Sequence, residues 1–286
     1  MKTSALLLAA IAATTALLGA PVDYQKPDPT YINFTKRSGK WEDAKNWDRK
    51  QVPDKDQAAI IRDNASVTLS TKVPLVGTVH VGGMGVSTLT VSEGGQLEIL
   101  DKLHVSRSRS NSTALLFIDG GSVRVGLNTQ SSIAKMELGF SQSTSCNAWT
   151  KIKSGSFEGG MLIGNHLPNT GTGTLSVIGS KPVVRANIGR DSILLNTFGT
   201  LEFILDEEGV AGMDYTKSSV KLAKGSAILV EGSAYTGGPK TFVLLQSKKF
   251  TNEGARMSCS GFNPAKYDAS VFFDRARGIV LRIKTK

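Results

Sequence analysis

Short segments in which apolar and polar residues alternate recur along this chain, and glycine interrupts each of them. The segments are TLTVSEGGQLEI from Thr88, ALLFIDGGSVRV from Ala114, WTKIKSGSFEGG from Trp149 and GTLSVIGSKPVV from Gly173. Alternation over about five or six residues, rich in Val, Ile, Leu, Thr and Phe and ended by Gly, Asn, Ser or Asp, is typical of short half-buried strands. Helical spacing is hard to find in the same region, so the pattern predicts an all-β fold.

These segments repeat at a nearly regular distance. Aligned on Gly95, Gly121, Gly155 and Gly179, they are separated by steps of 26, 34 and 24 residues. A second phrase lies between the anchors, near Leu103, Met136, Leu162 and Ile188. About two dozen residues per unit suits the coils of a β-solenoid, in which inward-facing apolar residues stack from coil to coil. We expect the longest step to hold a projecting loop, GFSQSTSCNAW from Gly139; a β-sandwich of similar strands is the alternative architecture.

The glycine-separated strands, some of which end in LIGN or NIGR, resemble those of secreted right-handed β-helix repeat proteins of bacteria, of the passenger and surface-exported type. The segment SGKWEDAKNWDRKQVPDKDQAAI resembles their opening coil and is similar to the start of the extracellular eight-glycine domain. Its matching positions are Gly39, Trp41, Asn46, Trp47, Val52, Pro53 and Asp56. The resemblance covers most of the chain from Gly39 onward. It implies a single-stranded right-handed β-helix with an aromatic N-terminal cap and closing C-terminal strands, and it says almost nothing about activity.

The first residues have the layout of a secretory signal peptide. Lys2 precedes an apolar run from Ala5 to Leu18, and small residues follow near Ala20. The run is too short to span a bilayer comfortably, although an apolar N-terminal anchor is the alternative. We therefore expect a signal peptide over 1–20, a linker over 21–38 and one β-helix domain over 39–286, on a protein that is secreted or lies at the cell surface. Within that domain we expect a cap over 39–60, coils over 61–230 and closing strands over 231–286.

Positive charge is concentrated in the last quarter of the sequence. The formal net charge of the chain is +10 at pH 7, and from Met213 onward 13 Lys and Arg stand against five Asp and Glu. Such a balance predicts an acidic polymer, such as an acidic polysaccharide, as partner, whereas a solvated basic surface that keeps the protein soluble is the simpler reading. The residues expected to contact a polyanion are Lys240, Lys248, Lys249, Arg256, Arg275 and Arg277.

Two tryptophans near the start of the expected β-helix are consistent with two roles. Trp41 and Trp47 stand six residues apart, and indole rings stack on sugar rings when a pocket presents them. The favoured interpretation is that both cover the open end of the apolar core, because the terminal coil of a solenoid must close it.

The sequence gives little support for a metal site or a disulfide bond. His80, His104 and His166 are spaced by 24 and 62 residues, which is no metal-ligand spacing, although stacking of coils would align the first two. We expect no metal and no cofactor, and histidines in turns or on the surface. Cys146 and Cys259 are 113 residues apart, and whether they pair is left open.

A catalytic role would need carboxylates converging from adjacent coils. Asp101, Asp119 and Glu137, with Lys135 or Arg124 nearby, are the candidates for a glycoside hydrolase or polysaccharide lyase. Isolated outward charges on strands are equally what a solvated surface needs. The sequence therefore favours a non-catalytic surface, matrix or adhesion-type protein; an enzyme on the same fold and a self-assembling structural subunit are the alternatives.

Overall fold

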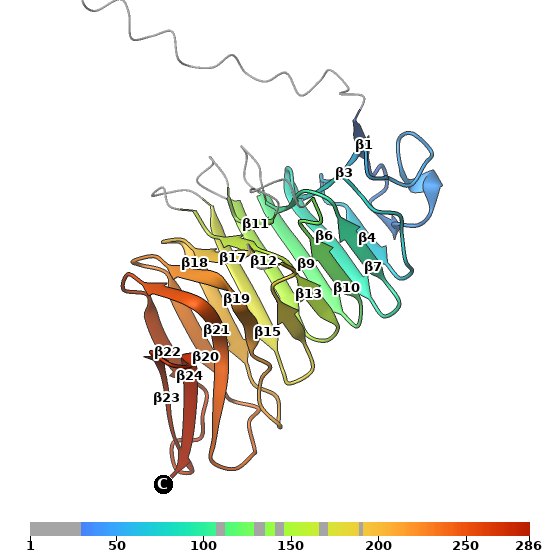
Figure 1. Ribbon diagram of the computed structural model, residues 1–286. Helices are drawn as coiled ribbons and strands as arrows, with labels where there is room; N and C mark the ends of the chain where they lie inside the picture. The colour runs from blue at the N-terminus through green and yellow to red at the C-terminus, as the bar shows by residue number, and fades with distance from the viewer. Residues whose placement is uncertain (1–29, 107–111, 129–134, 141–145, 166–170, 189–190) are drawn as a thin grey trace, which may run out of the picture.

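The computed structural model describes residues 30–106, 112–128, 135–140, 146–165, 171–188 and 191–286, so the predicted signal peptide lies outside the described residues. Within them the fold is all-β, with strands β1 to β24 and a single 3-10 turn, η1 (Ala44–Asn46). Figure 1 shows the strands stacked one circuit after another, from the blue N-terminal end to the red C-terminal end.

We describe the fold as three parallel ladders of strands, numbered 1 to 3. Ladder 2 is a nine-stranded parallel sheet that runs the length of the described fold. Each strand of this ladder pairs with the strand that the chain forms one circuit later. Two strands that are neighbours in the ladder are therefore separated in the sequence by strands of the other sheet. In spatial order its strands are β2 (Ser38–Lys40), β4 (Ser66–Leu69), β6 (Gly85–Ser92), β9 (Ser112–Asp119), β12 (Cys146–Ile152), β15 (Thr172–Ile178), β18 (Gly199–Ile204), β20 (Ala227–Glu231) and β22 (Arg256–Ser260).

Ladders 1 and 3 are the two arms of a second, 15-stranded sheet. Ladder 1 contains β1 (Tyr31–Asn33), β3 (Ala58–Ile61), β5 (Thr78–Val81), β8 (Leu103–Val105), β11 (Met136–Leu138), β14 (Met161–Ile163) and β17 (Ser192–Leu195). Ladder 3 contains β7 (Gln96–Ile99), β10 (Ser122–Val125), β13 (Ser156–Glu158) and β16 (Val183–Arg185). Both arms meet at β19 (Met213–Leu222), whose start pairs with β16 and whose end pairs with β17. These long parallel sheets are compatible with a β-solenoid and differ from the antiparallel pairing of a β-sandwich.

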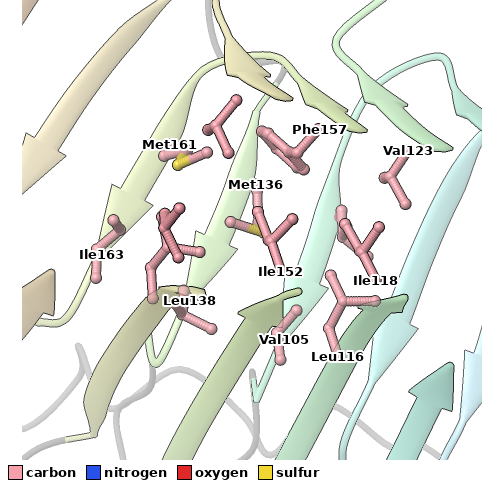
Figure 2. Packing of buried hydrophobic residues seen from close by; sticks show 14 of the residues in the cluster. Val105, Leu116, Ile118, Val123, Met136, Leu138, Ile152, Phe157, Met161 and Ile163 are labelled. Atoms are coloured by element: carbon pink, nitrogen blue, oxygen red, sulfur yellow. The ribbon is translucent and has the colours of Figure 1, made fainter. Parts of the chain in front are cut away.

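The core lies between the ladders and consists of side chains that stack in register. One column of ladder 2 contains Val67, Leu89, Leu116, Thr150, Leu175, Leu201 and Ile228, all fully buried. Figure 2 shows how Leu116, Ile118 and Ile152 of this ladder meet side chains of the other two ladders, among them Met136, Met161 and Phe157. Burial of a large apolar side chain stabilises a fold by about 1.5–3 kcal/mol, so this stacked column explains why the strands alternate.

The glycine anchors mark the corner between ladders 2 and 3. Gln96, Ser122 and Ser156, which directly follow Gly95, Gly121 and Gly155, are register partners, so the alignment of these three anchors is confirmed. Gly155 has φ 82°, and a Cβ there would lie 2.0 Å from the carbonyl oxygen of Gly121. Adjacent circuits therefore approach too closely for any side chain at this position. The fourth anchor is wrong, because the register partner of Ser156 is Val183, which follows Pro182, and Gly179 stands three residues earlier, directly after β15.

Two further details of the expected repeat are wrong. Ile188 lies in a connection, and the strand that stacks on β14 is β17, where Ile193 pairs with Met161. The extra length of the longest step lies between β10 and β11, over 126–135, of which 129–134 are outside the described residues. Part of GFSQSTSCNAW, residues 141–145, is likewise not described, and its end forms the regular strand β12. Because the extra residues lie in a connection, the strands on either side of it keep their register with the preceding circuit.

At the N-terminal end, Trp41 and Trp47 are both fully buried. The indole Nε1 of Trp47 donates a 2.8 Å hydrogen bond to the carbonyl oxygen of Trp41, and the rings meet edge to face at 5.0 Å. Phe34 packs edge to face on Trp47 at 5.2 Å. Neither indole presents a face to solvent, so neither is placed to stack on a sugar.

The parallel sheets begin and end outside the boundaries expected from sequence. Strand β1 falls within 21–38, the expected linker, where Tyr31 already pairs with Ala58 of β3. At the other end the parallel ladders continue through β21 (Lys240–Asn252) and β22, and among the described residues whole strands pair antiparallel only at the C-terminal end. There β24 (Gly278–Thr285) pairs with the start of β21 and with β23 (Tyr267–Asp274), and Figure 1 shows these strands at the C-terminal end.

Candidate functional site

Four of the six basic residues expected to contact a polyanion lie where the last hairpin meets β21. The rings of Phe250 on β21 and Phe273 on β23 lie 4.9 Å apart, so the strand segment with Lys248 and Lys249 adjoins the turn between β23 and β24. That turn carries Arg275 and Arg277, and all four basic side chains are exposed. We refer to Lys248, Lys249, Arg275 and Arg277 as the terminal basic cluster.

Within this cluster one cation is neutralised. The Arg277 guanidinium donates to Asp274 at 2.8 Å, and this side-chain hydrogen bond, with backbone donors of the turn, lowers the pKa of the Asp274 carboxyl. Among the ion pairs of the described residues none involves Lys248, Lys249 or Arg275. Lys248, Lys249 and Arg275 therefore have no ion-pair partner among the described residues, and they lie on a strand and a turn that the contact between Phe250 and Phe273 joins. Phe273 is 36% exposed.

The other two expected polyanion contacts lie elsewhere. Lys240 begins β21 and pairs with Ile283, and its ammonium sits 4.8 Å from the ring of Phe242. Eight residues of strand, at about 3.3 Å each, separate it from Lys248. Arg256 begins β22 in ladder 2 and pairs with Ala227. Four of the six expected residues therefore lie on β21 and the last hairpin, Lys240 and Arg256 lie apart from them, and contact with a polyanion stays a prediction.

A second group of charged residues forms on ladder 1, where three circuits bring His80, His104 and Glu137 into register. The two imidazoles lie 4.5 Å apart, and His104 Nδ1 is 2.9 Å from Glu137 Oε2. Lys102 Nζ donates to Glu137 Oε1 at 2.8 Å. His104 and Glu137 are buried, so the expectation of turn or surface histidines is wrong for His104, while His166 lies outside the described residues.

The environment of Glu137 fixes its charge. Burial raises its pKa, but the hydrogen bonds and positive charges of His104 and Lys102 outweigh burial and bring the pKa to about 2. Glu137 is therefore an ionised, doubly paired carboxylate at neutral pH and is unsuited to proton donation. In the part of the chain that the structure describes, no group of three or more His, Cys, Asp or Glu is arranged to hold a metal ion.

The remaining carboxylates of the hydrolase hypothesis have separate partners. Asp101 accepts from the Asn128 side chain at 2.9 Å, and Asp119 accepts from Ser154 at 2.7 Å. Neither contact involves Glu137. Of the two cations proposed with them, Arg124 lies on ladder 3, and Lys135 precedes β11. The structure thus gives no hydrogen-bonded pair among these three carboxylates in the described residues.

Arg124 belongs instead to a row of alternating charge on ladder 3. Register places Glu98, Arg124, Glu158, Arg185 and Asp214 on consecutive circuits. Arg124 reaches Glu98 at 2.8 Å and Glu158 at 3.4 Å, and Arg185 reaches Glu158 at 2.5 Å. Because the signs alternate, these pairs hold the outward face of ladder 3 together and leave little net charge for a ligand.

A groove follows the glycine corner beside this row. Its volume is about 410 Å³, and its lining is the backbone of Gly94, Gly95, Gly120, Gly121 and Gly155 with Gln96, Ser122, Ser156, Lys181 and Val183. The absence of side chains exposes peptide groups there, but the close approach at Gly155 shows that stacking alone demands these glycines. The close packing of the circuits therefore accounts for this groove without a role in binding.

The two cysteines do not pair. Cys146 is buried in β12 and its sulfur accepts from Ser112 Oγ at 3.4 Å, whereas Cys259 in β22 lies beside the carbonyl oxygen of Ala269 at 3.1 Å; no disulfide bond joins them. Among the described residues no helix has the length and apolar character to cross a membrane.

Comparison of the chain with protein-family models, with curated proteins and with solved structures finds no match.

Proposed function

We propose that this protein is a secreted, non-catalytic right-handed β-helix that acts as a surface or matrix protein and binds acidic polysaccharide through the terminal basic cluster. The proposal rests mainly on three exposed cations without an ion-pair partner among the described residues, Lys248, Lys249 and Arg275, which lie on β21 and on the turn that adjoins it. Export rests on the signal-like sequence of residues 1–20, and handedness rests on the resemblance of the repeats.

The chemistry of the cluster suits a polyanion better than a small anion. Its side chains are exposed and long, and no buried donor converges on one point, so each cation contacts a different group along an extended polymer. Attraction of this kind is multivalent and weakens with salt, because exposed charges are screened beyond a Debye length of about 10 Å at 0.1 M. Non-catalytic action is supported by the separate partners of Asp101, Asp119 and Glu137.

Binding to heparin, polygalacturonate and uncharged dextran, measured by co-sedimentation at low and high salt, tests the proposal. The triple substitution Lys248→Gln, Lys249→Gln and Arg275→Gln is expected to weaken binding to the acidic polymers about tenfold, since each exposed pair contributes about 0.5 kcal/mol. The matched control removes the same charge at the N-terminal end, where Lys36, Lys40 and Lys72 are also exposed: Lys36→Gln, Lys40→Gln and Lys72→Gln. Equal weakening by both triples would mean that net charge, not the cluster, drives binding.

The same samples test for catalysis. Unsaturated or reducing ends appearing with time in any polymer would contradict the non-catalytic part of the proposal. Absence of binding to every acidic polymer at low salt would refute the binding part.

A further inference from the structure

Unlike Trp41 and Trp47, the third tryptophan of the chain, Trp149, is not fully buried. Trp149 lies in the middle of β12, and its neighbours Ala148 and Thr150 are buried toward the core. Trp149 itself is partly exposed and is not part of the buried core cluster. Since successive side chains of a strand point to opposite faces, its indole lies on the outward face of ladder 2.

Apolar side chains of the neighbouring strand accompany this indole. In ladder 2, Leu115 of β9 is the register partner of Trp149, and Phe117 follows two residues later on the same outward face. Both are partly exposed and, like Trp149, lie outside the core cluster. Adjacent strands are about 4.8 Å apart, so the three side chains cover one small continuous area, which we call the outward aromatic face.

Hydroxyl groups border this area on both sides. The row that contains Leu115 and Trp149 continues through threonines in the neighbouring circuits, and a further threonine pairs with Phe117. These threonines are Thr88, Thr174 and Thr200 in the first row and Thr90 in the second. The edge of the face thus offers donors and acceptors rather than more apolar surface.

The charges beside the face balance. Lys151 follows Trp149 on the same outward face, and register continues from Lys151 through Ser176 to Glu202. The Ser176 hydroxyl donates to Glu202 at 2.5 Å. One ammonium and one carboxylate at the same border favour an uncharged, hydroxyl-rich ligand over a polyanion.

We propose that the outward aromatic face binds a neutral glycan, with a pyranose ring stacked on the indole of Trp149. A sugar ring has one apolar C–H face and a rim of hydroxyls, which matches a flat indole bordered by threonines, Lys151 and Glu202. A protein partner would need about 800 Å² of complementary surface with an apolar centre, and three apolar side chains bordered by hydroxyls fit that requirement poorly.

This site is independent of the terminal basic cluster. It lies on β9 and β12 in the middle of ladder 2, whereas the cluster lies on β21 and the last hairpin. Stacking on an indole does not depend on ionic strength, whereas contact with exposed cations does. Salt therefore separates the two sites, and failure of one leaves the other standing.

Intrinsic fluorescence is a direct measurement of this site, because Trp41 and Trp47 are fully buried and Trp149 is not. The protein is titrated with cellohexaose, laminarihexaose, xylohexaose, mannohexaose and chitohexaose at low salt and at about 1 M salt, where the Debye length is about 3 Å. We expect at least one neutral oligosaccharide to change the emission, with an affinity that salt leaves within about twofold.

Substitutions then assign the effect. Trp149→Ala is expected to weaken binding about tenfold or more, measured by calorimetry, and Trp149→Phe is expected to retain part of it because a smaller aromatic face remains. Phe273→Ala, which removes an exposed ring on the last hairpin, is expected to leave binding unchanged. Circular dichroism of each variant verifies the fold, which an outward substitution does not disturb.

Three results would overturn the proposal. The first is no response to any of the five oligosaccharides. The second is binding that Trp149→Ala leaves intact. The third is self-association, seen by sedimentation and removed by Trp149→Ala, in a protein that binds no sugar, since the face would then be an interface between copies of this chain.

Discussion

His104 Nδ1 lies 2.9 Å from Glu137 Oε2, and both side chains are buried on neighbouring strands of ladder 1. Lys102 contacts the other carboxylate oxygen at 2.8 Å. A buried carboxylate with two cationic or donor partners stays ionised, and loss of one partner leaves a charge without compensation. This contact therefore couples the stability of the central circuits to pH.

Acid is expected to destabilise the fold through Glu137. Its folded-state pKa of about 2 lies below the ordinary value of 4.5, so the stability it contributes is present above about pH 4.5 and is lost as the pH falls through 2. The full contribution is on the order of 3 kcal/mol. Urea unfolding of the protein and of Glu137→Gln between pH 2 and 6 measures it, and the variant is expected to be less stable near pH 6 and to depend less on pH.

Glu98→Gln is the control for this prediction. Glu98 is partly exposed and pairs with Arg124 on the outward face of ladder 3, so its loss is expected to cost less than about 1 kcal/mol. If Glu98→Gln and Glu137→Gln change the pH dependence equally, acid destabilisation does not arise at the buried contact.

Trp47 is expected to hold the N-terminal circuits closed. Trp47→Ala removes a fully buried indole and its hydrogen bond to Trp41, and a cost of about 3–5 kcal/mol is expected for such a truncation. Because each circuit of a stacked fold contacts its neighbours only, the loss is expected to be local. Amide hydrogen exchange is expected to accelerate in β1 to β5 and to stay unchanged in β18 to β22. The outward Trp149→Ala serves as the control, and equal acceleration in that variant would contradict a specific role for Trp47.

The repeat was predictable from the sequence because glycine and alternation are both enforced by stacking. Once Gly95, Gly121 and Gly155 are aligned, the third residue after each anchor is Glu98, Arg124 and Glu158, which form the alternating charges of ladder 3. The spacing from the glycine anchors therefore predicts that these three charges lie in one row, although only Arg124 was named as a candidate residue. Likewise the 24 residues between His80 and His104 equal one circuit, which is why the two imidazoles stack.

Other features had no local signal. Glu137 lies 33 residues after His104, whereas the two histidines are 24 residues apart, so a constant step along the sequence does not place Glu137 in register with them. Alternation of buried and exposed residues predicts the place of one tryptophan only. In NAWTKI, Trp149 alternates with the apolar or buried residues Ala148 and Thr150, which indicates that its indole points outward. Trp41 and Trp47 lie outside any alternating strand, so their burial depended on closure of the core end. The grouping of Lys248 with Arg275 depended on the hairpin formed by β23 and β24.

Gly155→Ala is expected to distort the corner between ladders 2 and 3. The backbone has φ 82°, and the new methyl group would lie 2.0 Å from the Gly121 carbonyl oxygen on the preceding circuit. Strain and overpacking together are expected to cost about 2–5 kcal/mol, measured as a shift of the urea midpoint. At Gly238 a Cβ would have nothing within 4 Å, so Gly238→Ala is expected to change stability by less than about 0.5 kcal/mol. Tolerance of Gly155→Ala would mean that the circuits can move apart at this corner.

Thr150 is expected to be a position at which the core can be improved. It stacks between Leu116 and Leu175 in an otherwise apolar column, and its hydroxyl has only a weak acceptor, the Met136 sulfur at 3.8 Å. Thr150→Val keeps the shape and removes a buried hydroxyl, so a gain of about 0.5–1.5 kcal/mol is expected in urea unfolding. Thr150→Ala, which also removes the hydroxyl but leaves a space, is expected to lose stability. Loss of more than about 1 kcal/mol in Thr150→Val would show instead that the hydroxyl contributes a specific contact that holds ladders 1 and 2 together.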